Sequence, residues 1–593
     1  MTNKINNSTA VTIDSPITLT LDDERRLTGK SLLWDKPGAI LDAFVSGVDK
    51  QKVVDQWLVY VDHLLEQLNW AHESSCYRIF EDGISLAISA PLDALYACCE
   101  VNEAAWNFTN TFLLTGSQSE DHAEKMSQTV AHLKQVIADE ANPALMSLIQ
   151  LARQNSTPYL VDDDEFSLGY GRNCQRWPIN SLPDPATLTW QHYQTIPIAL
   201  VTGTNGKSTT VRIMSEIIKQ SGKCCGVTST DFIRVGEDII DYGDYSGPGG
   251  ARMLLRHPKT ETAILEVARG GILRRGLPID HADAALITNI AEDHLGQYGI
   301  NTVEGLAQTK AVVAKALSKG TLILNADDDY LVALSPSLNV NKCWFALQED
   351  NVVLQQHKAN GGAICFIRDQ AIFYAEKDRD HHHRETKIIA VNDIPMTLKG
   401  AAQHNIQNAL GATALAKSLG LNNSAIRCAL KNFSSNVDDN PGRGNQFEVN
   451  GANVIMDFAH NVHSMNAMAS TTAQMPAKRK FLMLSHAGDR SDQDIINMTK
   501  SALTMKPDVL IAAEIVDYLR GRAPGEVSHL IAKTAIESGL SAENIYFAAD
   551  PYQGTLQIIN QLSSQDLALL MVLSGRDKVI DLLKNKTTIE AKS

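Results

Sequence analysis

The residues best suited to chemistry lie in a short loop, GTNGKST, at positions 203–209. Gly203 and Gly206 would let backbone N–H groups face phosphates at the start of a helix, where the helix dipole favours anions. The Lys207 ammonium would neutralise the β- and γ-phosphates of a nucleotide, and the Ser208 hydroxyl would coordinate Mg²⁺. A glycine-rich turn with a surface lysine is the alternative, but an apolar strand before the loop and a helix after it disfavour that interpretation.

Polar side chains also end the apolar runs that follow this loop along the chain. Glu266 ends the run TAILE, and Asn289, Asp293 and His294 follow the run AALIT. Ligands of open α/β sheets bind beyond the carboxyl ends of the strands, so these groups should gather near the loop. A carboxylate and an imidazole there can hold metal ions on a nucleotide and on a second substrate. Taken alone, each residue could equally be a solvated carboxylate or a hydrogen-bonded histidine.

Alternating strands and helices must position these groups. From residue 196 onward, short apolar runs such as IALVT, TAILE, AALIT and TLILN alternate with helical stretches. This alternation predicts a doubly wound parallel sheet, with the loop at the end of its first strand. A second α/β alternation begins after the polar joint SSNVDDNPGRGN, whereas residues 1–160 are rich in helical stretches and carry no nucleotide motif.

We therefore predict an α/β protein in four parts. These are a helix-rich N-terminal domain at 1–160, a connector at 161–195, a central P-loop domain with a doubly wound parallel sheet at 196–436, and a Rossmann-like α/β C-terminal domain at 437–593. A chain of 593 residues is too long for one hydrophobic core, which agrees with this division.

Composition restricts the class of protein. The 68 acidic and 53 basic side chains leave a net charge of -15, which argues against nucleic acid as the main partner, because phosphate binding needs a basic face. Nine cysteines show no ligand or disulfide spacing and indicate thiols in a reducing compartment. The polar start and the absence of a membrane-length apolar run predict a cytoplasmic protein. Three consecutive histidines, 381–383, are interpreted as a solvated tract rather than a metal site, since consecutive side chains point in different directions.

Several motifs occur in an order that resembles the Mur ligases and folylpolyglutamate synthetases, which are three-domain ATP-dependent amide ligases. The motifs are GTNGKST, Glu266, TNIAEDHLG, LNADD, HNIQNAL, NPGRGN and DFAHN. Longer stretches, among them ETAILEVARGGILRRGL and LRGRAPGEV, look like the Mur-ligase half of cyanophycin synthetase over residues 196–593. The stretch LARQNSTPYLVDDDEFSLGYGRNCQRW resembles the junction before the ATP-grasp domain of that family. Only about twenty residues separate it from the first strand, which leaves no room for a domain of about 200 residues.

The resemblance implies a reaction in which a carboxylate attacks the γ-phosphate of ATP to give an acyl phosphate, and an amine then displaces phosphate to form an amide. It implies two Mg²⁺ ions: Ser208 and Glu266 would hold the ion linked to ATP, and His294 would help to hold the other near the acceptor. Lys310 stands where many Mur ligases carry a carbamylated lysine, and a carbamate could bind metal where an ammonium would be repelled. A helix-surface lysine is the alternative.

The resemblance also extends the nucleotide site beyond the loop. Asn405 and Asn408 lie one helical turn apart, so both could face the adenine. Arg443 would reach the phosphates when the domains close, and Asp457 would bind the ribose hydroxyls. The remaining candidate nucleotide contacts are Thr204, Asn205, Thr209 and Asn289, with Asn325 and Asp328 as weaker ones.

Three further sets of residues are candidates for the substrates or for the closed state. Loops resembling those that bind the incoming amino acid or brace the closed state contain Asp489, Arg520 and Arg522. An anionic acceptor could meet Arg269, Arg274 and Arg275, although helix stabilisation or ion pairing explains these residues equally well. Phe458 keeps the ring but lacks the hydroxyl of the tyrosine usual in the family, and His460 lies beside Asp457.

Together these features predict an ATP-dependent ligase that joins a carboxylate to an amino acid amine. The resemblance favours arginine or lysine as the amine and an acidic peptide or polymer, aspartyl or glutamyl, as the acceptor. One alternative is a non-catalytic nucleotide-binding partner or regulator of a full-length cyanophycin synthetase. A peptidoglycan Mur ligase is disfavoured by the stretch ARGGILRRG and by the N-terminal region. A homo-oligomer and a polymer-binding N-terminal domain both stay open.

Overall fold

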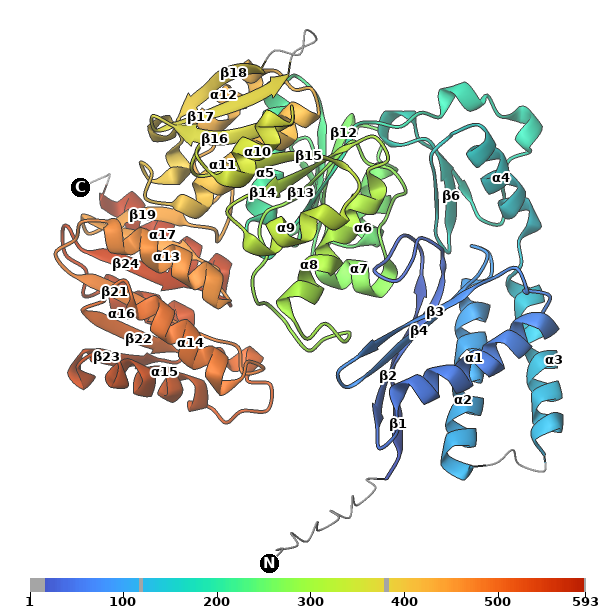
Figure 1. The fold of residues 1–593 in the computed structure, drawn as a ribbon. Helices are drawn as coiled ribbons and strands as arrows, with labels where there is room; N and C mark the ends of the chain where they lie inside the picture. Colours follow the sequence, from blue (N-terminus) through green and yellow to red (C-terminus); the bar gives the residue numbers. More distant parts are fainter. Residues whose placement is uncertain (1–15, 117–120, 378–382, 591–593) are drawn as a thin grey trace, which may run out of the picture.

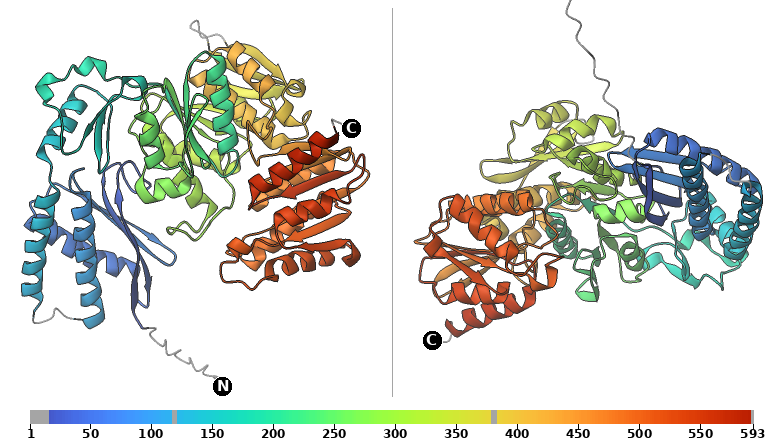
Figure 2. Two further views of the ribbon diagram at one scale, coloured as in Figure 1. Left: turned by 180° about the vertical axis from the view of Figure 1, so that it is seen from behind. Right: turned by 90° about the horizontal axis from the view of Figure 1, so that it is seen from below.

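The computed structural model describes residues 16–116, 121–377 and 383–590. An N-terminal part, a central domain and a C-terminal domain lie in a row, with the central domain between the other two (Figure 1, Figure 2). None of the described helices is long and apolar enough to span a membrane.

The N-terminal part combines a four-stranded antiparallel sheet with helices. The strands, in the order β1-β2-β4-β3, are β1 (Thr18–Leu27), β2 (Gly38–Ser46), β3 (Ser75–Phe80) and β4 (Gly83–Ser89). The helices are α1 (Lys50–Gln67), α2 (Leu95–Thr115) and α3 (His122–Glu140). They agree with the predicted helix-rich region, whereas the sheet was not predicted. Most of β2 and all of β4 are buried, so these strands lack the alternation that identifies a half-exposed strand.

A small module follows and packs against the central domain. It consists of α4 (Pro143–Gln154) and an antiparallel sheet of β5 (Tyr159–Val161), β6 (Glu165–Leu168) and β7 (Gln175–Pro178). The buried Arg256 of the central domain donates to the Ser167 hydroxyl at 3.2 Å and to the Glu165 carbonyl at 2.9 Å. The predicted connector therefore contains part of a folded module, and the domain boundaries stay predictions.

The central domain is built on an eleven-stranded sheet. From one edge to the other, its strands are β11 (Asp238–Tyr242), β10 (Phe232–Val235), β9 (Cys225–Thr228), β12 (Thr262–Glu266), β8 (Ile198–Thr202), β13 (Ala284–Ile287), β14 (Thr321–Asn325), β15 (Asn341–Ala346), β16 (Ala363–Arg368), β17 (Ala371–Lys377) and β18 (His383–Ala390). The seven strands from β9 to β16 in this order are parallel, and antiparallel strands extend both edges. The predicted doubly wound parallel sheet is confirmed.

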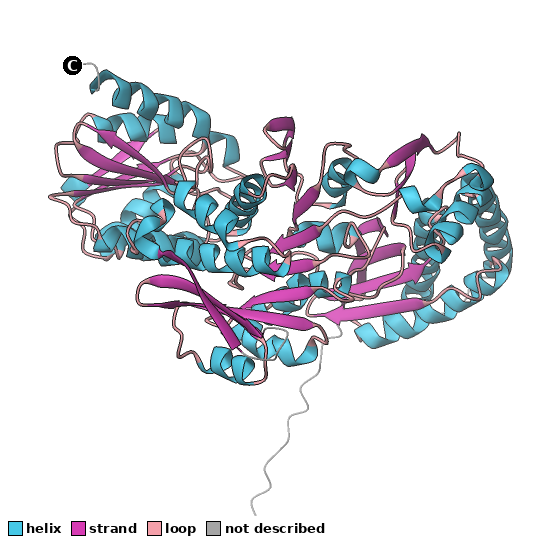
Figure 3. Cartoon of the chain, turned by 90° about the horizontal axis from the view of Figure 1, so that it is seen from above, coloured by secondary structure: helices cyan, strands magenta, loops and turns pink. Residues whose placement is uncertain are grey.

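Helices cover both faces of this sheet (Figure 3). On one face lie α5 (Lys207–Gln220), α11 (Gln403–Ser418) and α12 (Asn423–Asn432). On the other lie α6 (Pro248–Leu255), α7 (Arg269–Arg275), α8 (Val303–Ala311), α9 (Asp329–Leu334) and α10 (Val352–Ala359). Strand β8 has β12 on one side and β13 on the other, so the chain reverses its direction of winding there. Such switch points open a crevice at the carboxyl ends of the strands, where ligands bind.

The C-terminal domain has a six-stranded sheet that is parallel except for its first strand. In sheet order the strands are β19 (Asn445–Val449), β20 (Ala452–Asp457), β24 (Leu567–Met571), β21 (Lys480–Leu484), β22 (Val509–Ala513) and β23 (Ile545–Ala548). The helices are α13 (Val462–Gln474), α14 (Asp492–Leu503), α15 (Glu526–Glu537), α16 (Pro551–Ile559) and α17 (Arg576–Glu590). One apolar cluster lies on each face of the sheet, as the Rossmann-like prediction requires.

Candidate active site

The loop 203–209 joins β8 to α5 at the switch point of the central sheet. Gly203 and Gly206 adopt φ angles of +143° and +85°, and Gly206 is the N-cap residue of α5. A Cβ atom on Gly203 would clash with the Thr288 side chain, and one on Gly206 would clash with Asn408. Glycine is therefore required at both positions for conformation and for space.

Asn289 holds this loop in place. The backbone N–H of Asn205 donates to the Asn289 side chain, and that side chain donates back to the Asn205 carbonyl, both at 3.0 Å. The Lys207 ammonium donates to the Thr204 carbonyl at 2.9 Å. The predicted nucleotide contact Asn289 thus lies at the site and positions the loop.

A hydroxyl and a carboxylate meet beside the loop at the ends of α5 and β12. The Ser208 hydroxyl donates to Glu266 at 3.2 Å and lies 3.3 Å from the Thr230 hydroxyl. Glu266 is 2% exposed, and burial raises its pKa, although Lys207 and Ser208 oppose the shift. These oxygen donors are the type that Mg²⁺ prefers, so the residues fit a divalent cation. Thr230 was not predicted, because nothing in its local sequence distinguishes it from other loop threonines.

Lys310 lies on α8 below the same loop. Its side chain is buried, and its ammonium donates to the Gly203 carbonyl at 2.9 Å. Burial, and secondarily the charge of Lys207, lower the pKa of Lys310 well below its usual value. The helix-surface alternative is therefore wrong.

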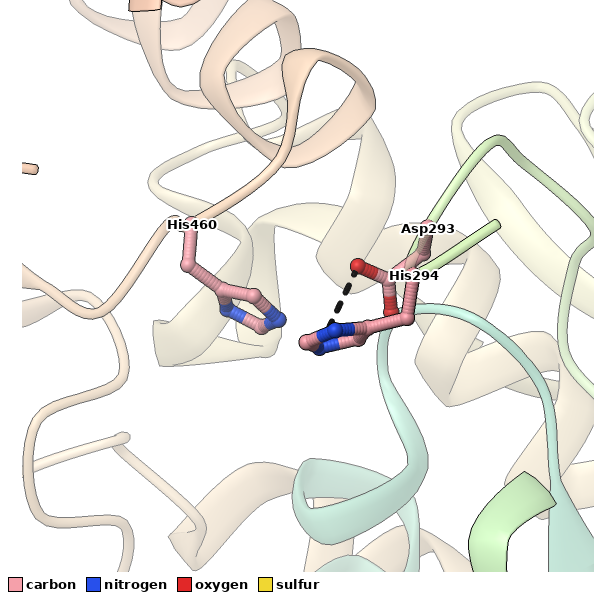
Figure 4. Close-up of side chains that lie close together, drawn as sticks. All are labelled: Asp293, His294 and His460. Carbon is pink, nitrogen blue, oxygen red and sulfur yellow. Dashed lines mark ion pairs between the residues drawn. The ribbon is translucent and has the colours of Figure 1, made fainter. Parts of the chain in front are cut away.

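Asp293, His294 and His460 bring their side chains together across two domains (Figure 4). Their potential ligand atoms lie within 4.8 Å of one another, and His294 Nε2 lies 3.7 Å from Asp293 Oδ1. His294 has a left-handed φ of +50°, and Arg269 donates to its carbonyl at 2.8 Å. Burial lowers the pKa of His460 to about 4, so its imidazole is neutral at pH 7 and can offer a lone pair to a cation. Arg490 lies 3.9 Å from Asp293.

A cavity of about 550 Å³ connects these groups between the central and C-terminal domains. The loop, Glu266 and Lys310 line it from one side, and Arg443, Asp457 and Phe458 line it from the other. The Arg443 guanidinium lies 5.0 Å from the centre of the Phe458 ring, so the phenyl group alone can support a cation–π contact. Burial raises the pKa of Asp457 to about 6 against the opposing charge of Arg443.

Asn405 and Asn408 line the same cavity, where the Asn408 amide donates to Asn405 at 3.3 Å. His404 and His463 accompany them and were not predicted. The structure does not bring Asn325 and Asp328 to this cavity. Their polar atoms support the backbone instead: Asn325 donates to the Thr288 carbonyl at 3.2 Å, and Asp328 accepts from the Ile290 N–H at 2.6 Å and caps α9.

A second cavity, of about 700 Å³, adjoins the cluster on the side of the C-terminal domain. It is lined by both signs of charge, from Asp489, Arg490, Asp494 and Arg520. Arg522 has a structural role instead: it forms ion pairs with Asp492 and Glu526 at 2.7 and 2.6 Å and donates to two loop carbonyls.

The three arginines of α7 divide into two sets. Arg269 and Arg274 line the 550 Å³ cavity, whereas Arg275 donates to the Arg26 carbonyl of the N-terminal part at 3.2 Å. The side chains of the histidine tract 381–383 lie outside what the structure describes.

Comparison with protein families divides the chain in the same way. Residues 201–416 match the Mur ligase middle domain, and residues 442–572 match the glutamate ligase domain of Mur ligases. The chain carries the middle and C-terminal domains of the Mur ligases. The cavity described above lies between these two Mur ligase domains.

Relatives of these Mur ligase domains include cyanophycin synthetases and a peptidoglycan Mur ligase. The chain is 34% identical to cyanophycin synthetase of Synechocystis over 66% of this chain and 44% of that protein. It is 36% identical to cyanophycin synthetase of Crocosphaera subtropica over 59% of this chain and 39% of that protein. It is also similar to a UDP-N-acetylmuramoyl-L-alanyl-D-glutamate–2,6-diaminopimelate ligase of Listeria innocua, with 22% identity over 60% and 72%. The chain thus spans less than half the length of the cyanophycin synthetases it matches. Among solved structures, E. coli FolC in complex with DHPP and ADP aligns with a TM-score of 0.48 and 17% identity over 67% of this chain and 89% of that one.

Proposed function

We propose that this protein is an ATP-dependent ligase that activates a carboxylate as an acyl phosphate and joins it to the amine of an amino acid. The observation that carries this proposal is the cavity between the two Mur ligase domains. The glycine loop, the Ser208–Glu266 pair, Lys310 and, from the C-terminal domain, Arg443 all line this cavity. Phosphoryl transfer depends mainly on positioning and on neutralising charge, which these groups supply.

Each group has a role in this reaction. Backbone N–H groups of the loop and Lys207 would bind the phosphates, and Arg443 would stabilise charge on the transferred phosphoryl group. Ser208 and Glu266 would hold Mg²⁺ on the nucleotide, and His294 would help to hold a second ion. These residues would thereby place positive charge where it reduces the repulsion between the phosphates and the attacking carboxylate. Asn405 and Asn408 would bind the adenine, and Asp457 the ribose. Lys310 would serve as a carbamate, formed when its neutral amine attacks CO₂ and releases a proton.

The charges around the cavities support a choice of substrates. The carboxylates Asp489 and Asp494 and the guanidinium of Arg490 line the 700 Å³ cavity, which suits a zwitterionic amino acid with a cationic side chain. Arginine or lysine is therefore the proposed amine. Arg269 and Arg274 suit an anionic acceptor such as an acidic peptide or polymer.

Phosphate release from Mg-ATP tests the proposal when amino acids are crossed with acidic acceptors, including aspartyl peptides and polyaspartate. Release that requires one amine and one acceptor together is the expected result. Lys207→Ala should lower this release at least about 100-fold, whereas Lys223→Ala, which removes an exposed lysine beyond α5, should not change it. Nucleotide binding without release under any combination would contradict the ligase and favour a nucleotide-binding partner of a full-length synthetase.

A further inference from the structure

Asp231 joins three elements beside the nucleotide cavity. It lies between β9 and β10, and its Oδ2 atom accepts from Arg212 of α5 at 2.6 Å. Its Oδ1 atom accepts from Arg576, the first residue of α17 in the C-terminal domain, at 3.1 Å. The Arg212 side chain is 1% exposed and that of Arg576 is 32% exposed. One carboxylate therefore connects the helix that follows the phosphate loop to the opposite domain.

A second set of contacts fixes the same connection. Arg212 also donates to the Asn440 side chain at 2.8 Å, and Asn440 donates to the Thr209 hydroxyl of the phosphate loop at 3.2 Å. Gly442, two residues further along the interdomain joint, has a φ of +75°. A Cβ atom on Gly442 would lie 2.8 Å from Cδ of Arg576, so the arginine stem packs directly on this glycine.

The charges favour an ionised Asp231 at the centre of this arrangement. Burial opposes its charge, but Arg212, Arg443 and Arg576 outweigh that effect and hold the pKa of Asp231 below its usual value. Both Arg576 and Arg443 line the cavity that contains the phosphate loop. Two arginines from the C-terminal domain thus line the same cavity as the loop that would hold the phosphates.

We propose that Asp231 is a positioning residue that holds Arg576 over the nucleotide cavity, so that the C-terminal domain presents Arg576 beside Arg443 to the terminal phosphate of a nucleoside triphosphate. This inference rests on the proposed function and extends it to the discrimination between triphosphate and diphosphate. A fixed guanidinium binds phosphate better than a free one, because less side-chain motion is lost on binding. Asp231 itself would not contact the phosphates; it would act on them only by positioning Arg576.

Calorimetric titration of the full chain with Mg-AMP-PNP and with Mg-ADP tests this inference. Arg576→Gln should weaken binding of the triphosphate analogue about tenfold and change ADP affinity less than about twofold, since a charge-assisted hydrogen bond to phosphate is lost. Asp231→Asn should weaken triphosphate binding in the same selective way. The double variant should bind no more weakly than Arg576→Gln alone, because both changes remove one arrangement.

Controls separate this role from general structural effects. Lys578→Gln removes an exposed positive charge from the same helix and should leave both affinities unchanged. Arg576→Lys keeps a charge without the guanidinium fork and should restore binding only in part. Should Asp231→Asn fail to fold because Arg212 loses its buried partner, Asp231→Glu keeps the charge and displaces Arg576.

Each outcome decides a distinct point. An unchanged ratio of the two affinities in Arg576→Gln would overturn the inference and leave the ligase proposal intact. A changed ratio in Arg576→Gln, with wild-type behaviour in folded Asp231 variants, would remove Asp231 from the role. A wild-type chain that binds neither nucleotide would overturn the proposed function and this inference together.

Discussion

Burial decides the chemistry of Lys310. The residue is 4% exposed, its amine lies 2.9 Å from the Gly203 carbonyl, and burial lowers its pKa well below the usual value. A neutral amine keeps its lone pair, which is the form that reacts with CO₂. The sequence places this lysine in a helix but cannot say which side of the helix faces the core, so its reactivity follows only from the folded structure.

Lys310→Ala should lower ligase turnover about 100-fold, measured as phosphate release, because a charge-bearing group is lost beside the phosphates. Removal of dissolved CO₂ should slow the wild-type protein, and added bicarbonate should restore its rate. The exposed Lys319, which follows Lys310 in the sequence, provides the control, and Lys319→Ala should behave as wild type. A wild-type rate that is indifferent to CO₂ would contradict the carbamate.

Asp457 should make nucleotide binding depend on pH. Burial raises its pKa to about 6, so below pH 6 the carboxylate that would accept the ribose hydroxyls becomes protonated. Nucleotide affinity should fall by up to about tenfold for each pH unit below this value, and Asp457→Asn should bind weakly and without this dependence.

The free energy of unfolding should also depend on pH through Asp457, in a direction that the raised pKa determines. Between the ordinary carboxyl pKa and about 6, the folded protein binds more protons at Asp457 than the unfolded chain does, so the free energy of unfolding decreases as pH rises through this window. Asp457→Asn should remove that part of the slope in chemical denaturation. The same slope in both proteins would show that Asp457 titrates normally.

Contiguous motifs explain which site residues could be predicted. The phosphate loop follows a recognisable strand and Glu266 ends another, and the types of these residues indicate the chemistry. Thr230, Asp231 and Arg576 are ordinary loop or helix-end residues whose proximity depends on strand pairing and on the docking of two domains. No short-range pattern contains that information.

At the scale of elements, the connection from β8 to α5 depends on the backbone more than on side chains. Gly206 is both left-handed and in contact with Asn408 of α11, so this turn also sets the spacing between two helices on one face of the sheet. The alternation of apolar runs predicted four strands of the central sheet, β8, β12, β13 and β14, and a second α/β alternation in the C-terminal domain. It did not predict β1 to β4. Of these, β2 and β4 are largely buried, and buried strands resemble short buried helices in sequence.

Gly206→Ala should abolish detectable nucleotide binding and lower the free energy of unfolding by about 2 kcal/mol, through left-handed strain together with the clash at Asn408. Gly222→Ala is the matched control. It has a φ of +79° at the other end of α5 but open space around its Cβ position. Gly222→Ala should therefore lower the thermal unfolding temperature through the same left-handed strain, and it should bind nucleotide normally.

At the scale of the whole molecule, buried charges hold the N-terminal part against the central domain. Arg25 of β1 forms an ion pair with the buried Asp42 at 2.8 Å and donates to the Leu273 carbonyl of α7 at 3.1 Å. Helix α7 also carries Arg269 and Arg274 of the cavity. Docking of the N-terminal part thus contributes to the position of the proposed acceptor site.

Arg25→Ala should destabilise this contact by about 3 kcal/mol, because Asp42 is left buried without its partner. The change should appear as faster proteolysis between the N-terminal part and the central domain and as a lower midpoint temperature of the first unfolding transition. Arg176→Ala, at an ion pair on the surface, should alter either measurement little. Equal effects of the two substitutions would show that Arg25 does not hold the domains together.

The order of the central strands also has a consequence for synthesis of the chain. Strand β8 is the first strand of the central sheet to be synthesised, yet its two neighbours in the sheet are β12 and β13, which emerge from the ribosome later. The phosphate loop therefore cannot reach its final surroundings until Thr288 and Asn289 have been translated and paired with it. Nucleotide cannot assist the early folding of this domain, and a nascent chain would acquire nucleotide affinity only after most of the parallel sheet has formed.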